Sequence, residues 1–154
     1  MITAVEDVND AKKLVIAQKI VTRFGEDLTH FTFGIWGLAF KPGNDDMREA
    51  PAIYVIKELV KRGAKIRAYD PKAINEAKEF YLKEVQNITY AESKYDVLKD
   101  SHALVLLTEW KEFRSPDFDK IKSVLKSPII FDGRNQYIAF DMENNGFEYY
   151  RIGK

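Results

Sequence analysis

The chain contains no cysteine among its 154 residues. Disulfides, thiolate metal sites and a cysteine nucleophile are therefore excluded for this polypeptide. An excess of one charge is absent as well, because 24 Lys and Arg residues balance 24 Asp and Glu residues. A neutral chain without a broad basic field is not expected to bind nucleic acid.

Long apolar runs and a targeting segment are also missing. Runs such as HALVLLTEW, residues 102–110, are far too short to span a bilayer. The N-terminus shows no basic region followed by an apolar stretch. We therefore expect no membrane insertion and a cytoplasmic location. The two histidines, His30 and His102, are isolated in the sequence, and we predict no metal site.

Strand and helix periodicities, by contrast, alternate from residue 31 to the end of the chain. This alternation predicts an α/β fold: a Rossmann-like three-layer sandwich with a mostly parallel sheet, preceded by a long N-terminal helix over residues 4–24. Strands are expected at 30–40, 64–70, 88–91, 103–108, 128–133 and 147–153, and helices at 49–62, 70–85, 93–100, 115–126 and 140–146. Proline at the first helical position supports the helices over 70–85 and 115–126, with Asp70 and Ser115 as their N-caps.

Charged residues follow several of these strands. Ligands of an open parallel sheet bind at the carboxyl ends of the strands, near the point where strand order reverses. Lys41 follows the first strand and Arg134 follows PIIFDG, and we expect them to converge on one crevice across that point. Arg48, near the start of the next helix, adds a third cation. Such a cluster suits an anionic ligand such as a diphosphate.

Each of these residues also has a structural interpretation. Lys41 can be a solvated loop lysine, and Arg134 can simply pair with Asp132. Asp45 and Asp46 are more typical of a helix cap than of a metal site. The residue pattern leaves these alternatives open.

A dinucleotide site is not predicted, although Asp70 ends a strand as a ribose-binding acid does. Gly34 and Gly37 lie three residues apart and do not form the G-x-G-x-x-G fingerprint that should accompany such an acid.

Four linked motifs add a resemblance to a known family. They are GLAFKPGNDDMREAPA at 37–52, RAYDP at 67–71, TEWKEFRSPDF at 108–118 and FDGRN at 131–135. Their order and spacing resemble the C-terminal, UDP-binding domain of the UDP-glucose/GDP-mannose dehydrogenase family. Motifs that extend over about 100 residues are far more specific than any lone short pattern.

The resemblance implies a role for particular residues. The full enzymes oxidise the C6 alcohol of UDP-glucose to a carboxylate with two NAD+, through a thiohemiacetal on a cysteine. By the resemblance, Phe40 and Lys41 contact the UDP-sugar, as does Arg134. Arg48 reaches the NAD that is bound by the other domain.

The resemblance also implies a division of the chain. Residues 1–25 correspond to part of the central helix that joins two domains and forms the dimer core, and residues 26–154 to the C-terminal UDP-sugar-binding domain. Expected partners are therefore UDP-glucose or UDP, the N-terminal NAD-binding domain of the same enzyme, and a second copy of the chain in a homodimer. The nucleotide fingerprint and the catalytic cysteine, lysine and asparagine of the family are absent here. We therefore expect NAD to be bound mainly by the N-terminal domain, and this chain alone to be inactive and to hold no catalytic residue.

Parts of the sequence also suit three other functions. TEWKEFR favours the UDP-glucose branch over a UDP-N-acetylmannosamine or GDP-mannose dehydrogenase domain. Asp45, Asp46 and Thr108 would suit a receiver-like module, but Arg134 stands where a receiver needs a lysine. A noncatalytic nucleotide-binding domain is the third alternative.

Overall fold

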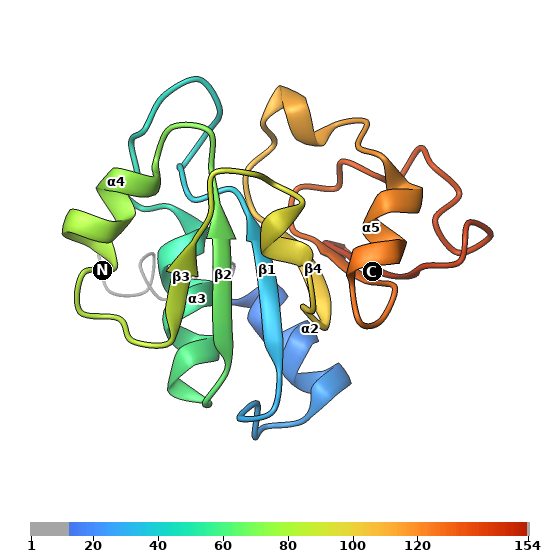
Figure 1. Cartoon of the computed structure of the whole chain (residues 1–154), viewed down its shortest axis with the longest axis horizontal. Coiled ribbons are helices and arrows are strands. Elements are labelled where there is room, and N and C mark those ends of the chain that lie inside the picture. The colour runs from blue at the N-terminus through green and yellow to red at the C-terminus, as the bar shows by residue number, and fades with distance from the viewer. Residues whose placement is uncertain (1–12, 154) are drawn as a thin grey trace, which may run out of the picture.

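The computed structural model describes residues 13–153, and in it six strands form one parallel sheet (Figure 1). The sheet order is β3-β2-β1-β4-β5-β6, and every neighbouring pair is parallel. The strands are β1 (Thr32–Trp36), β2 (Lys65–Tyr69), β3 (Ile88–Tyr90), β4 (Ala103–Leu106), β5 (Ile129–Asp132) and β6 (Glu148–Arg151). The predicted Rossmann-like α/β architecture is confirmed, and strand order reverses between β1 and β4.

Helices cover both faces of the sheet. Two of them, α2 (Val15–Phe24) and α3 (Pro51–Lys61), contact each other behind the sheet in the view of Figure 1. The shorter elements η2 (Asp96–Leu98), η3 (Lys111–Phe113) and α5 (Phe118–Val124) lie toward the viewer. Strands β4 and β5 are buried along their whole length, because layers on both sides keep water from them.

The first helix is described only in part. Residues 1–12 lie outside the described part of the chain, so the predicted helix over 4–24 is confirmed from Val15 to Phe24. It ends as expected at Gly25, whose φ is 101° and whose amide donates to the Val21 carbonyl. Ile16, Ala17 and Ile20 form its buried face.

Four predicted helices differ from the structure. The segment expected to be helical over 93–100 forms the three-residue 3₁₀ turn η2. The helix over 115–126 begins at Phe118, because the Asp117 carboxylate, rather than Ser115, caps it by accepting from the Lys120 amide at 3.0 Å. Residues 140–146 form turns instead of a helix: the amides of Asn145, Gly146 and Phe147 donate to carbonyls four, three and five residues earlier, so no regular helical spacing is kept. The helix over 70–85 is shorter, with α4 (Ile74–Glu76) continuing into a π-helical turn, η1 (Ala77–Tyr81).

The two glycines that failed the dinucleotide pattern serve close packing. A Cβ on Gly34 would lie 2.7 Å from the Val97 carbonyl oxygen in η2. Gly37 has a φ of +101°, and a Cβ there would lie 2.5 Å from Thr108, just beyond β4. The ends of β1 and β4 therefore approach closely only because residue 37 has no side chain.

We predict that Gly37→Ala lowers the free energy of unfolding by more than Gly43→Ala does. Gly43 is a matched control, because its φ is +104° and a Cβ there meets nothing within 4 Å. Gly43→Ala is expected to cost about 1 kcal/mol for the left-handed backbone alone. Gly37→Ala adds overpacking of roughly 1–3 kcal/mol. Urea unfolding measures both, and equal losses would contradict the close approach of β1 and β4.

Candidate functional site

The carboxyl edge of the sheet is organised around Asp70, which follows β2 and is 2% exposed. Its Oδ2 accepts hydrogen bonds from the amides of Leu38 at 2.7 Å and Ala39 at 3.0 Å, and from the Trp110 indole at 3.0 Å. Its Oδ1 accepts from the amides of Lys72 and Ala73, each at 2.8 Å. One carboxylate thus joins the segments that follow β1, β2 and β4.

This placement corrects the predicted role of Asp70. It caps the turn at Lys72 and Ala73 rather than the helix itself, which begins at Ile74. A ribose-binding role does not fit either, because the carboxylate is buried and both of its oxygens already accept hydrogen bonds from the protein.

The loop after β1 presents three of the predicted site residues. The Phe40 side chain is 47% exposed, and its amide donates to the Asp46 carbonyl at 2.8 Å, which closes the loop. Lys41 is exposed. The Arg48 side chain is 79% exposed, and its guanidinium donates to both carboxylate oxygens of Asp46. These hydrogen bonds lower the pKa of Asp46 to about 2.

Asp46 therefore acts locally, through Arg48, and does not cap α3 as predicted. The residue preceding α3 is Ala50, which makes no side-chain cap. Within residues 13–153, no group of three or more His, Asp or Glu side chains is arranged to hold a metal ion.

A second buried carboxylate supports the turn that carries Arg134. Asp132 ends β5, and its Oδ1 accepts from the Arg134 amide at 3.1 Å. Its Oδ2 accepts from the Tyr137 amide at 2.8 Å and the Tyr149 hydroxyl at 2.7 Å. Burial of the Tyr149 hydroxyl raises its pKa, and the hydrogen bond to Asp132 raises this pKa further. Asp132 thus fixes the backbone of the turn at Arg134 through its hydrogen bond with the Arg134 amide.

The Arg134 side chain pairs with Glu109, not with Asp132. Its Nε and Nη2 donate to the Glu109 Oε2 at 2.9 and 2.6 Å. Glu109 was not among the predicted site residues. The positions of the two residues could have indicated this pair, because Glu109 follows β4, Arg134 follows β5, and these two strands are neighbours.

The strand order also differs from the placement expected for Arg134. Arg134 follows β5, and β4 separates that strand from β1, which precedes Lys41. The convergence of Lys41 and Arg134 stays a prediction. Arg134 instead lines a cavity of about 230 Å³ with Lys13, which forms an ion pair with Glu49. Its other lining residues are Ile16, Pro51, Leu107, Gly133 and Ile152.

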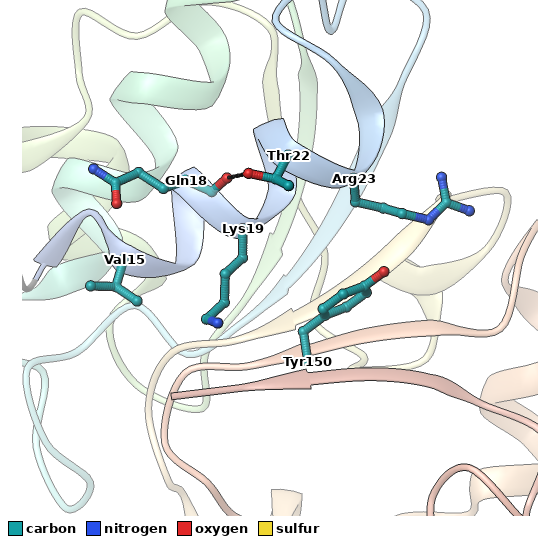
Figure 2. Close-up of a pocket in the computed structure, with 6 residues that line it drawn as sticks. All are labelled: Val15, Gln18, Lys19, Thr22, Arg23 and Tyr150. Carbon is teal, nitrogen blue, oxygen red and sulfur yellow. Dashed lines mark hydrogen bonds between the residues drawn. The ribbon is translucent and has the colours of Figure 1, made fainter. Parts of the chain in front are cut away.

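A separate hollow of about 620 Å³ lies between α2 and β6 (Figure 2). Figure 2 shows Gln18 and Thr22 on α2, where the Thr22 hydroxyl donates to the Gln18 carbonyl at 2.9 Å, and Tyr150 facing them from β6. Val15, Lys19 and Arg23 complete its lining. None of the predicted site residues contributes to this hollow.

The strand order, with charged loops at the carboxyl edge beside the reversal point, defines an α/β ligand-binding domain of the Rossmann-like class. Residues 34–139 match the model of the UDP-glucose/GDP-mannose dehydrogenase family, UDP binding domain. The chain belongs to this family.

Named relatives agree with the family match. The chain is 37% identical over 147 residues to a UDP-glucose 6-dehydrogenase of Rhizobium meliloti, covering 96% of this chain and 33% of that protein. It is 38% identical over 156 residues to the enzyme of that name from Pseudomonas aeruginosa, covering 100% of this chain and 34% of that protein. It thus spans about a third of the length of these relatives.

A solved structure gives the same result for the fold. A UDP-glucose dehydrogenase from Pyrobaculum islandicum matches with a TM-score of 0.73 at 26% identity, over 97% of this chain and 31% of that one. In addition, no helix within residues 13–153 has the length and apolar character to cross a membrane.

We predict that Asp70→Ala lowers the free energy of unfolding by about 3 kcal/mol or more, because buried donors lose their acceptor. Asp27→Ala is the matched control, since Asp27 accepts from the Thr29 amide at 3.0 Å on an exposed turn. That variant should change stability by under about 1 kcal/mol. Hydrogen exchange at Leu38 and Ala39 should accelerate only in Asp70→Ala. Equal losses in the two variants would contradict the central role of Asp70.

The Asp46–Arg48 pair generates a prediction about pH. The folded-state pKa of Asp46, about 2, lies below the ordinary value of 3.8. Its stabilising effect is therefore complete above the ordinary pKa and is lost as the pH falls toward 2. Arg48→Gln should raise the Asp46 pKa toward 3.8, as measured by NMR titration of the carboxyl carbon. Arg62→Gln, at the end of α3, should leave that pKa unchanged, and an unaltered pKa in Arg48→Gln would refute the pairing.

Proposed function

We propose that this chain supplies the UDP-binding part of an NAD-dependent UDP-glucose 6-dehydrogenase. The observation that carries the proposal is the match of residues 34–139 to the UDP binding domain of the family. The names of the Rhizobium meliloti and Pseudomonas aeruginosa relatives support UDP-glucose as the substrate. In the whole enzyme, UDP-glucose would be oxidised to UDP-glucuronate with two NAD+.

In this proposal the exposed ring of Phe40 and the ammonium of Lys41 contact the UDP-sugar from one side. Arg134 contacts it from the other, with its guanidinium on the diphosphate. Guanidinium and ammonium groups form the strong, charge-assisted hydrogen bonds that phosphate oxygens accept. Asp70 and Asp132 do not contact the ligand in this proposal. They accept hydrogen bonds from the backbone of the two loops that carry Lys41 and Arg134.

The residues at the end of β1 do not fit NAD in the manner of a dinucleotide fold. The amides of Leu38 and Ala39, which would have to face a pyrophosphate, donate to Asp70. Thr108 occupies the space beside Gly37. We therefore assign NAD mainly to an N-terminal domain of the same enzyme. The exposed Arg48 is the residue of this chain that we expect to reach it.

The proposed division of the chain follows from the same assignment. Residues 1–25 would form part of the helix that joins the two domains and builds a homodimer, and residues 26–154 the UDP-sugar-binding domain, in a cytoplasmic enzyme. Within the described part, α2 buries Ile16 and Ile20 on this domain.

A receiver-like module gains no support, because Asp46 is paired with Arg48 and the Thr108 hydroxyl donates to the Ala39 carbonyl at 2.6 Å.

We predict that UDP raises the melting temperature of this chain. A ligand that binds only the folded state adds about 2.7 kcal/mol at a hundredfold excess over its dissociation constant. Arg134→Ala should abolish the shift and Lys41→Ala should reduce it, because each removes a charge-assisted contact of roughly 1.5–3 kcal/mol. Thermal unfolding with and without millimolar UDP measures the effect.

Two cations at the opposite edge of the sheet are the controls. Lys65 begins β2 and Arg62 follows α3, so neither lies at the carboxyl ends of the strands. Lys65→Ala and Arg62→Ala should keep the UDP-induced shift of the parent chain. The proposed site is wrong if the control variants lose the shift while Lys41→Ala and Arg134→Ala retain it.

A further inference from the structure

Within residues 13–153, the guanidinium of Arg134 is held along one edge, that of Nε and Nη2. Nε and Nη2 both donate to a single oxygen, Glu109 Oε2, at 2.9 and 2.6 Å. A guanidinium has five N–H donors in a planar fork. No residue in the range 13–153 accepts a hydrogen bond from Nη1 of Arg134. The edge formed by Nη1 and the second N–H of Nη2 is therefore available to two oxygens of a ligand.

Glu109 is itself fixed by its chain neighbours. The Thr108 hydroxyl donates to the Ala39 carbonyl at 2.6 Å, and the Trp110 indole donates to Asp70 at 3.0 Å. The other carboxylate oxygen, Oε1, is buried and accepts no hydrogen bond from any described residue. Within residues 13–153, the hydrogen bonds that the Glu109 carboxylate accepts thus come from Arg134.

An acid beside a phosphate-binding arginine has two opposing effects. Its negative charge repels a diphosphate and lowers affinity. Its hydrogen bonds hold the long arginine side chain in one geometry, and this reduces the conformational entropy that binding must remove. The two effects differ in sign, so they can be separated by experiment.

We propose that Glu109 is a positioning residue for the UDP-sugar site: it holds Arg134 by the Nε–Nη2 edge so that the Nη1–Nη2 edge meets the diphosphate. This inference rests on the proposed function, because it requires Arg134 to bind the diphosphate. Glu109 does not touch the ligand in this arrangement and acts through Arg134.

The test compares two variants at one position. Glu109→Ala removes the acceptor and should weaken UDP binding roughly tenfold, the effect of one misplaced charge-assisted contact. Glu109→Gln keeps an oxygen acceptor and removes the charge, so it should bind UDP as tightly as the parent or more tightly. Titration calorimetry with UDP on the 154-residue chain measures both.

A second readout follows Arg134 in the absence of UDP. The Nε–H resonance of Arg134 in ¹⁵N NMR should be sharp and slow to exchange in the parent and in Glu109→Gln, and averaged in Glu109→Ala. Glu58→Ala is the matched control, because the Glu58 side chain is 23% exposed like that of Glu109 and its Oε2 accepts from the Arg62 Nε at 2.7 Å. This control should alter neither UDP affinity nor the Arg134 resonance.

The outcomes separate this inference from the proposed function. If Glu109→Ala binds UDP as tightly as the parent or more tightly while Arg134→Ala loses it, Glu109 is only a counter-charge and the inference alone is overturned. Equal losses of affinity in Glu109→Ala and Glu109→Gln, with an unchanged Nε–H resonance, also overturn it alone. A parent chain that binds no UDP overturns both.

Discussion

The carboxyl edge of this domain depends on one buried carboxylate. Asp70 accepts from the amides after β1, the turn after β2 and the indole after β4, so it joins three separate segments at the point where strand order reverses. Buried donors left without an acceptor are costly, and this cost ties the loop bearing Phe40 and Lys41 to the sheet. The same device recurs at β5, where Asp132 holds the turn that carries Arg134.

These internal carboxylates change what the Rossmann-like frame can bind. In a dinucleotide fold the amides at the first strand's end face a pyrophosphate. Here Asp70 takes that place for Leu38 and Ala39, and the Thr108 side chain packs against Gly37. In the proposed function, the anion is bound instead by side chains of the loops, Lys41 and Arg134. The proposed UDP-sugar site, with NAD on another domain, is consistent with this arrangement.

The accuracy of sequence-based prediction varied with the range of the interactions involved. Apolar periodicity predicted the six strands and α3 because burial of a face is written into local spacing. Helix ends were less accurate: Asp117 and not Ser115 caps α5, since several polar residues there could serve as a cap. Residues 140–146 show the limit of periodicity: the sequence predicts a helix there, but the backbone hydrogen bonds have mixed spacings and the segment forms turns.

By itself, the sequence determined the fold class and the family, and it marked Phe40, Lys41, Arg48 and Arg134 as candidate site residues. Motif spacing and periodicity are properties of the linear chain, and they need no knowledge of distant contacts. Only the tertiary structure decided that Glu109 is the partner of Arg134 and that Asp70 lies beneath the loop of Phe40 and Lys41, because these pairings form between segments that strand order brings together. Arg48 pairs locally, with Asp46 two residues earlier in the same loop. Because β4 lies between β1 and β5, the neighbour of Arg134 is the residue after β4 and not the one after β1.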